Sequence, residues 1–270
     1  MIEVLKQQFT PDMTPEDKLN RTREFLQIIA LKIMYDKGVF DNIAFTGGTA
    51  LRILFNLRRF SEDLDFSLIS KKGYNFEKIN QDLIYGLKLY GLDVESRPET
   101  DKNVHSSFLK FSGLLKELGL SPLKGQKISV KVEVDTNPPA GGKVEKTIVN
   151  KVYMLGITHF DLPSMFSTKL SACFYRKYTK GRDFYDLVWY LSKGIKPNFR
   201  LLNNAIKQIE GSAPRINEEN FKDFLLNKID KVDFSLVRKD VERFLEDKSE
   251  LKLLDKKIIK DNIRKLMYRD

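Results

Sequence analysis

The sequence predicts an α/β fold with a mixed sheet in its first half and an all-helical second half. Apolar residues in the run Lys127–Asp135 alternate strictly with polar ones, which is the period of a strand with one buried face. A second apolar run, Ile43–Thr46, ends at two glycines, as a strand does at a tight turn. From Asp161 onward, helix-start and helix-end signals follow one another without a strand pattern between them.

The first half begins with a strong helix-start signal at Thr14. Thr14 is a good cap, Pro15 suits the first helical position, and acids fill the first turn, so we expect a helix that ends by Gly38. A short helix from Ala50 to about Asn56 follows the first strand. Leu114–Leu118 fits either a short helix or the continuation of a strand. The remaining elements expected here are a strand over Asp63–Leu68, a helix over Phe76–Tyr90, and strands over Leu92–Arg97, Val104–Phe111, Lys127–Asp135 and Val144–Tyr153.

The second half is predicted to be a succession of helices. Asp161-Leu162-Pro163 is a second cap-and-proline start, and it predicts a helix to about Tyr175. Further helices are expected over Arg182–Lys193, Asn198–Ile209, Glu218–Asn227, Phe234–Leu245 and Lys256–Tyr268. We therefore expect two domains, an α/β domain over residues 1–156 and a basic helical domain over residues 157–270.

The net charge of +10 is unevenly distributed along the chain. Residues 1–150 carry 22 Lys and Arg against 20 Asp and Glu, and residues 151–270 carry 25 against 17. A basic surface indicates a nucleic-acid or phosphate partner, although solvated lysine-rich helix faces give the same composition. Cys173 is the only cysteine, which excludes a disulfide framework and a Cys-based metal site. With no signal-peptide core and no run that approaches a membrane span, we expect a cytoplasmic protein without a membrane partner.

The stretch from Ile43 to Leu68 carries the clearest chemistry. Side chains two apart on a strand share a face, so Asp63 and Asp65 are expected side by side while Leu64 and Phe66 enter the core. Adjacent carboxylates repel one another unless a cation joins them, and Mg²⁺ is the usual one. The glycines before them allow a phosphate close to the backbone, and the helix that follows adds its positive end.

The glycine turn and the Asp63 and Asp65 pair resemble the polymerase-β-like nucleotidyltransferases, and this resemblance implies a third carboxylate from a later strand, here Lys127–Asp135. Glu133 has an apolar residue on each side, and Asp135 stands at the strand end, where sites often lie. We favour Glu133 and keep Asp135 as the alternative. The competing interpretation of Glu133 is a solvent-facing acid paired with Lys131 on the same strand face.

These pieces together resemble the nucleotidyltransferase signature of the polymerase-β-like superfamily. That signature is a Gly-Gly or Gly-Ser turn, a spacer, and then acid–apolar–acid–apolar; here the spacer is residues 50–62, and Asp63 to Phe66 matches the acidic part. The resemblance implies a polymerase-β-like core in which Asp63 and Asp65, with the later acid, hold Mg²⁺ or Mn²⁺. It implies that Gly47, Gly48 and Thr49 seat a nucleoside triphosphate (NTP).

Three longer segments are similar to the AbiEii/AbiGii toxin family of nucleotidyltransferases: Phe45–Arg52, Arg59–Phe66 and Arg176–Leu187. The resemblance weakens beyond Gly194. It implies a toxin of a type IV toxin–antitoxin or abortive-infection system with a separately encoded antitoxin. It also implies transfer of a nucleoside monophosphate from an NTP to an acceptor, with release of pyrophosphate; some members of the family modify the acceptor ends of tRNA, so RNA is the expected acceptor.

The same resemblance extends the expected site. The family uses a Lys, which Lys169 fits, and a late Arg-Asp/Asp segment. We expect catalytic roles for Lys169, Asp183 and Asp186, and nucleotide contacts from Arg59, Ser61, Lys180 and Arg182. The alternative for Lys169, Asp183 and Asp186 is an interhelical salt-bridge cluster that joins the two halves. Arg52, Arg58 and Arg59 would either meet phosphates or RNA, or offset the nearby acids.

Two other classes of function remain open at this stage. One keeps the enzyme and changes the acceptor to a small molecule or a protein side chain. The other is a catalytically inactive nucleic-acid-binding module of the same fold, against which the intact Asp-x-Asp pair counts. A carboxylate-metal nuclease would also use such acids, but it would shorten RNA instead of extending it.

Overall fold

The computed structural model describes residues 1–123, 125–212 and 214–266, and these form two compact units. The first unit comprises residues 1–56, 60–137 and 145–159. The second comprises residues 57–59, 138–144 and 160–270, of which 213 and 267–270 lie outside the described residues. The boundary expected at residues 156 and 157 falls inside a strand. Two short segments from the first half also belong to the second unit, which no single boundary along the chain can express.

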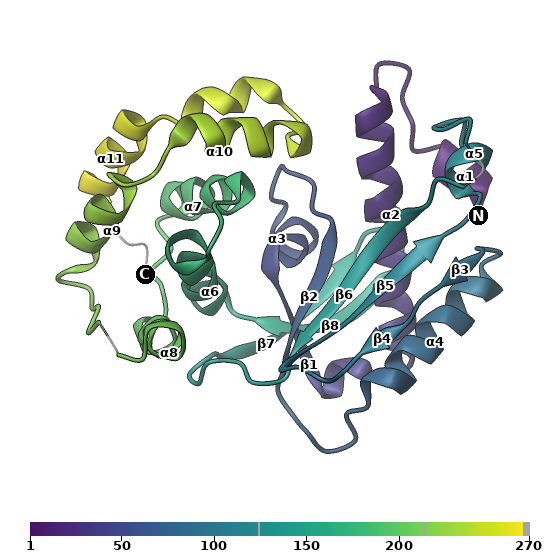
Figure 1. Cartoon of the computed structure of the whole chain (residues 1–270), viewed down its shortest axis with the longest axis horizontal. Coiled ribbons are helices and arrows are strands. Elements are labelled where there is room, and N and C mark those ends of the chain that lie inside the picture. Colours follow the sequence, from purple (N-terminus) through teal and green to yellow (C-terminus); the bar gives the residue numbers. More distant parts are fainter. Residues whose placement is uncertain (124, 213, 267–270) are drawn as a thin grey trace. The chain divides into compact units, whose positions relative to one another are not determined.

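An eight-stranded mixed sheet organises the first unit, as far as the structure describes it (Figure 1). Its order is β3-β5-β6-β2-β1-β8-β7, and β4 pairs with β5. Neighbours run antiparallel at β1–β2, β5–β6 and β3–β5 and parallel at β2–β6 and β1–β8. The strands are β1 (Ile43–Thr46), β2 (Asp63–Leu68), β3 (Val94–Glu95), β4 (Pro98–Glu99), β5 (Val104–Phe111), β6 (Ile128–Asp135), β7 (Val144–Asn150) and β8 (Met154–Phe160).

The two long helices of the first unit start and end close to where their sequence signals predict. In α2 (Pro15–Asp36), Thr14 and Asp17 form a reciprocal capping box, and the helix stops before Gly38, which has φ +67°. α2 and α4 (Phe76–Leu89) pack against one another and against the sheet, and Gly86 lets the Ile33 side chain approach closely. The other helices are α1 (Ile2–Lys6), α3 (Gly47–Phe55), α5 (Leu114–Glu117) and the 3₁₀ turn Val39–Asp41.

The strand predictions fail at two places. The strand expected over Leu92–Arg97 is only β3, and the two-residue β4 begins at Pro98 and pairs with β5 in the same register. β8 was not predicted at all. Gly156 interrupts its apolar pattern and suggests a turn, but the ring of Tyr35 lies 3.3 Å from where a Cβ at residue 156 would stand. This glycine therefore serves packing in the middle of a strand.

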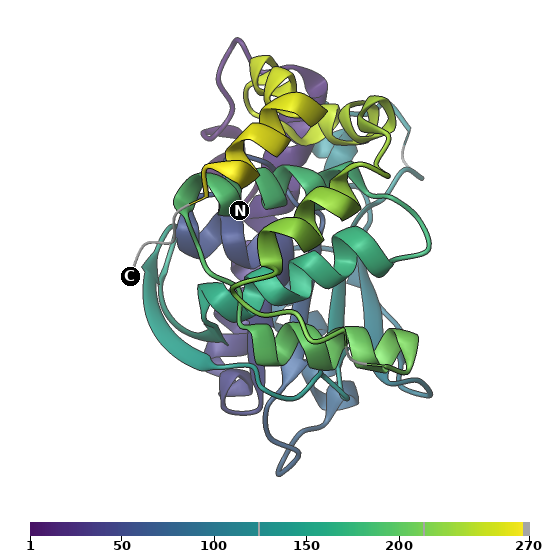
Figure 2. The same ribbon diagram turned by 90° about the vertical axis from the view of Figure 1, so that its left-hand side faces the viewer.

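The second unit is built from helices (Figure 2). They are α6 (Leu162–Tyr175), α7 (Gly181–Lys193), α8 (Phe199–Glu210), α9 (Phe221–Ile229), α10 (Phe234–Val241), α11 (Lys256–Arg264) and the 3₁₀ turns Glu242–Phe244 and Lys248–Leu253. α6 packs against α7 and α8, and α7 packs against α10 and α11. Buried rings fill the interior, among them Phe166 stacked on Tyr190 with centroids 4.4 Å apart. Met267 and Tyr268, the end of the last expected helix, lie outside the described residues.

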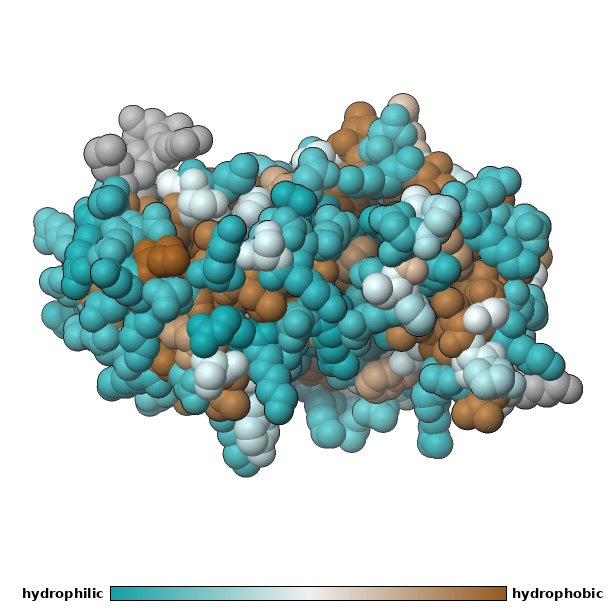
Figure 3. All heavy atoms as spheres, turned by 90° about the horizontal axis from the view of Figure 1, so that it is seen from above, coloured by the Kyte–Doolittle hydropathy of each residue, from teal (hydrophilic) through white to brown (hydrophobic). Residues whose placement is uncertain are grey.

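The described helices include none with both the length and the apolar composition needed to cross a bilayer. Figure 3 views the molecule from above, and hydrophilic side chains predominate on that face, with small separate apolar areas between them. The predicted α/β core with a mixed sheet and a helical second part is confirmed.

Candidate active site

The two acids of the Asp-x-Asp pair lie on one face of β2. Asp63 and Asp65 are partly exposed, whereas Leu64 and Phe66 between and after them are buried on the opposite face. β6 lies parallel beside β2, with Asp65 opposite Glu133 and Asp63 opposite Lys131. Residues opposite one another on neighbouring strands point to the same face, so Asp63, Asp65 and Glu133 share one surface of the sheet.

Register also separates the two candidates for the third carboxylate. Asp135 is opposite Ser67, one alternate position farther from Asp63 than Glu133 is. Burial raises the pKa of Asp135 above its ordinary value of 3.8, although the hydrogen bond that its Oδ1 accepts from the Asn137 N–H, at 2.9 Å, acts the other way. Glu133 instead forms an ion pair with Lys131 at 2.7 Å. Glu133, the candidate opposite Asp65, is thus paired with Lys131, as the solvent-facing interpretation of Glu133 expected.

Gly47 is fixed at the end of β1 by its closeness to Asp65. Its φ is +76°, a conformation that costs any other residue free energy. A Cβ at residue 47 would stand 2.9 Å from the Asp65 Cβ and 3.0 Å from its Cγ, and it would overlap the carboxylate itself. Only glycine therefore leaves the Asp65 carboxylate where it is.

The glycines open α3 directly, without the separate turn that the sequence suggests. The Thr46 hydroxyl donates to the Asp65 carbonyl at 3.3 Å and does not cap the helix. Thr49 is fully buried, and its hydroxyl donates to the Asp63 carbonyl. Both hydroxyls thus hold β2 in place, and the groups that face an anion here are the backbone N–H groups of the first helical turn.

The residues on β2 and β6 suit a hard divalent cation in their chemistry. Carboxylate oxygens are the donors that Mg²⁺ and Mn²⁺ prefer. Over the described part of the chain, no group of three His, Cys, Asp or Glu side chains is arranged to hold a metal ion. At β6, the Glu133 carboxylate accepts a hydrogen bond from the Lys131 amino group. The site as described therefore offers Asp63 and Asp65 together, with the third acid engaged by a lysine.

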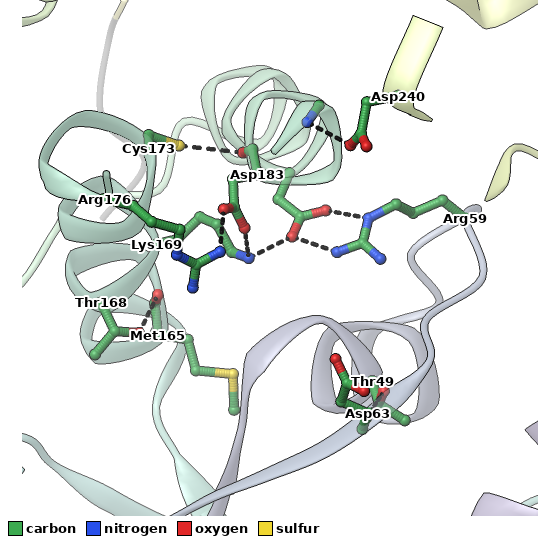
Figure 4. Close-up of polar contacts among 12 residues, drawn as sticks. Thr49, Arg59, Asp63, Met165, Thr168, Lys169, Cys173, Arg176, Asp183 and Asp240 are labelled. Atoms are coloured by element: carbon green, nitrogen blue, oxygen red, sulfur yellow. Dashed lines mark hydrogen bonds and ion pairs between the residues drawn. The ribbon is translucent and has the colours of Figure 1, made fainter. Parts of the chain in front are cut away.

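A second acidic cluster lies inside the second unit and is held together by cations (Figure 4). The Lys169 amino group on α6 lies 2.7 Å from Asp183 and 2.9 Å from Asp186, both on α7. Arg59 adds a bidentate pair to Asp186, with both nitrogen–oxygen distances 2.6 Å. Arg176, at the end of α6, pairs with Asp183 at 2.9 Å. We call these five residues the α6–α7 ion cluster.

The ion cluster is desolvated and yet ionised. Arg59 is 2% exposed and Asp186 is fully buried. Burial alone would raise the pKa of Asp183, but the charges of Lys169 and Arg176 outweigh it and leave that pKa below 3.8. Burial alone would lower the pKa of Lys169, and Asp183 and Asp186 reverse this and raise it. Burial likewise raises the pKa of the Cys173 thiol, which donates to the Asp183 carbonyl at 3.2 Å.

These contacts bear on the residues expected at the nucleotide. Arg59 is not presented to solvent, because Asp186 takes both arms of its guanidinium. Lys169, Asp183 and Asp186 form salt bridges between two helices, as the alternative interpretation expected. These salt bridges lie within the second unit, because all members of the cluster belong to it. Arg52 pairs with Glu24 and lies 4.0 Å from the Phe60 ring centroid, so it too is a structural cation.

The remaining expected contacts differ in exposure. Ser61 is buried, and its carbonyl accepts a hydrogen bond from Gln27 at 3.0 Å. Lys180 is exposed just before α7, and the Arg182 guanidinium stacks 4.3 Å from the Phe244 ring centroid. Sequence reasoning missed Arg176 as a partner of Asp183. It stands at the C-cap of α6, where the helical spacing rule that relates Asp183 to Asp186 does not apply.

The comparison with protein families decides the identity. A family model described as "Nucleotidyl transferase AbiEii toxin, Type IV TA system" matches residues 30–258, most of the chain. The chain belongs to this family. As an AbiEii-family protein it is a nucleotidyltransferase, and the matched range includes both the β2–β6 acids and the α6–α7 ion cluster.

A solved structure has a fold similar to that of this AbiEii-family chain. A crystal structure described as that of a candidate nucleotidyltransferase from H. pylori has a TM-score of 0.52 and 19% identity, covering 92% of this chain and 97% of that one. JHP933 from Helicobacter pylori has a TM-score of 0.47 and 20% identity, covering 90% and 94%. A search of curated proteins found no match.

Proposed function

We propose that this nucleotidyltransferase transfers a nucleoside monophosphate from an NTP to an RNA acceptor, tRNA in particular, in a reaction that depends on Mg²⁺ or Mn²⁺ and releases pyrophosphate. The proposal includes a role as a cytoplasmic toxin that a separately encoded antitoxin restrains. It rests on the family to which the chain belongs and on the arrangement of the β2–β6 acids.

One observation carries the reaction class. Asp63 and Asp65 lie on the same face as Glu133. The N-terminus of α3 starts at Gly47, which lies so close to Asp65 that no Cβ fits there. An anion at the start of α3 would thus lie beside two carboxylates, an arrangement that repels a triphosphate unless a cation lies between them. A site that needs a cation to accept its substrate is what a metal-dependent nucleotidyltransferase requires.

The roles of the residues follow from these positions. The N–H groups of Gly47, Gly48 and Thr49 would donate to phosphate oxygens, and the Thr46 and Thr49 hydroxyls would keep β2 in register while they do so. Asp63, Asp65 and Glu133 would hold the cation. When bound, the cation would neutralise phosphate charge and activate the phosphorus toward the acceptor hydroxyl.

In this proposal, Lys131 determines when Glu133 is able to bind the cation. Its amino group neutralises Glu133 in the structure as described, at 2.7 Å, and it lies opposite Asp63. Glu133 would exchange this lysine for the cation, so the third ligand would be recruited and not preformed. In the second unit, the ion cluster would support the fold around Lys169, with Lys180 and Arg182 nearer to solvent.

The test is a labelling assay with purified full chain, Mg²⁺, each of four labelled NTPs in turn, and total tRNA. We expect label from one or more NTPs in tRNA, and a loss of at least about 10–100-fold in Asp65→Ala, since groups that only support a metal ligand already contribute about that much. Asp101→Ala removes an exposed acid of the same unit and is the matched control. Glu133→Gln and Asp135→Asn decide between the two third acids.

Other results would redirect the proposal. Label in a small molecule or a protein with none in RNA would replace the acceptor. Shortened RNA would indicate a nuclease. Equal labelling by wild type and Asp65→Ala, or no labelling at all together with identical effects of the two proteins in cells, would leave only a binding module of this fold.

A further inference from the structure

A pocket of about 590 Å³ lies in the second unit, and none of the five residues of the ion cluster lines it. The loop between α6 and α7 forms one wall with Lys177 and Tyr178, and α10 with the turn after it forms the other with Leu236, Lys239 and Arg243. All five side chains are exposed. We call this the loop–α10 pocket.

The two walls are joined by specific contacts, so the pocket is built and not a chance gap. A Cβ on Gly181 would overlap the carbonyl oxygen of Val237 and stand 3.0 Å from the Val241 nitrogen. The Gly181 N–H also donates to Asp240 at 2.7 Å. The end of the loop therefore rests directly on the α10 backbone, which fixes Lys177 and Tyr178 relative to Lys239 and Arg243.

The charges of the pocket indicate an anionic occupant. Lys177, Lys239 and Arg243 face it with one carboxylate, Asp240, whose oxygen already accepts from a backbone N–H. Residues 151–200, which include the loop, carry nine Lys and Arg against three Asp and Glu. Three cations on a solvent-open rim attract a polyanion more than a single small anion, because each contact releases counterions from the polymer.

The exposed ring of Tyr178 indicates which kind of anion would bind in the pocket. Tyr178 is 69% exposed, and the Lys177 amino group lies 5.4 Å from its ring centroid. An exposed ring flanked by cations is the arrangement by which proteins hold single-stranded nucleic acid, with a base stacked on the ring and phosphates on the cations. An acidic peptide would use the cations but would leave the ring without a partner.

We propose that the loop–α10 pocket binds a single-stranded segment of the RNA acceptor, with one base stacked on Tyr178 and phosphates held by Lys177, Lys239 and Arg243. The inference rests on the proposed function for the choice of RNA as acceptor. It goes further in assigning acceptor binding to residues that lie outside the β2–β6 acids.

The experiment measures binding of fluorescent total tRNA and of a fluorescent single-stranded oligoribonucleotide to the full chain without NTP, over a range of salt concentrations. We expect Lys239→Gln/Arg243→Gln to weaken binding at least about tenfold and to reduce the slope of log K against log salt by about 1.4 for single strands, about 0.7 per phosphate contact. Tyr178→Ala should lose at least about fivefold, and Tyr178→Phe, which keeps the ring, should not.

Lys257→Gln/Lys265→Gln is the matched control, because it removes the same charge from two exposed positions, one in α11 and one at its C-cap. Equal losses in the control and pocket variants, unchanged binding in the pocket variants, or no RNA binding by wild type would each overturn the inference. The labelling assay separates the two proposals. If RNA labelling is unchanged in all pocket variants, the pocket proposal alone is wrong. If RNA binding depends on the pocket but labelling does not depend on Asp65, the transfer reaction alone is wrong.

Discussion

Two pairs of aspartates, Asp63 with Asp65 and Asp183 with Asp186, look alike in the sequence and differ in the structure. The first pair is partly exposed on a strand face, and the nearest lysine, Lys131, bonds to the neighbouring glutamate. The second pair is buried among three cations that neutralise it. One pair thus lies partly exposed on the sheet face that it shares with Glu133, and the other has its charges balanced by cations within the fold.

The difference shows that the same residue type can be neutralised inside the fold or lie partly exposed on a sheet face. A carboxylate pair with protein cations at 2.6–2.9 Å gains nothing from a metal ion, because the ion would have to displace those cations from a desolvated site. A pair at a strand face keeps its hydration and its repulsion, both of which a divalent cation relieves. The following changes test this contrast, in order of expected effect.

Asp186→Asn should have the largest effect on folding. It removes the charge that both Arg59 and Lys169 contact, and leaving such cations buried without it costs about 3–5 kcal/mol of the free energy of unfolding. Urea unfolding followed by circular dichroism measures the loss. Arg59→Met/Asp186→Asn removes the bidentate pair as a whole and should lose less than the two single changes added together. Additive losses would mean that the pair is not coupled.

Gly47→Ala should harm catalysis more than stability. The positive φ costs about 1–2 kcal/mol, and the new methyl group displaces the Asp65 carboxylate, for which a shift of about 1 Å reduces the rate about 100-fold. Gly73→Ala is the control, because Gly73 has φ +80° and nothing within 4 Å of its Cβ position. It should lose similar stability and keep its labelling rate. Equal losses of labelling in both variants would show that backbone strain alone is responsible.

The smallest effect concerns the acid stability of the ion cluster. The pKa of Asp183 in the fold is below its ordinary value of 3.8, so its charge stabilises the folded state above that pH. This stabilisation is lost as the pH falls toward the lower, folded-state pKa. The gap between wild type and Asp183→Asn in urea midpoint should therefore be constant from pH 7 to about pH 4 and shrink below that. A gap that widens in acid would contradict the assigned direction.

Local patterns in the sequence predicted the elements that bear the candidate site. β2 has its predicted bounds, and β6 begins one residue later than expected, because strict alternation and flanking turns are local signals. The shared face of Asp63 and Asp65 follows from alternation alone. The register that sets Asp65 opposite Glu133, and not Asp135, depends on strand pairing between residues about seventy apart, which no local pattern contains.

The ion cluster shows that motif resemblance does not predict which charged side chains pair with one another. Motif resemblance marked Lys169, Asp183, Asp186 and Arg59, but motifs do not state which charges meet. That Arg59 binds Asp186 depends on a three-residue segment of the first half joining the second unit. The roles of Thr46 and Thr49 were hidden for a similar reason, since a hydroxyl in a Gly-Gly-Thr turn can serve a ligand or a neighbouring carbonyl.

The single cysteine gives the second unit a chemical reporter of its folded state. The Cys173 thiol is bonded to the carbonyl of Asp183, and burial keeps its pKa high, so little of the reactive thiolate exists in the native state. A thiol reagent will therefore modify this partly exposed side chain more slowly in the native state than in the unfolded chain. With no second cysteine in the sequence to add to the signal, the ratio of the two rates measures how strongly the fold protects the thiol.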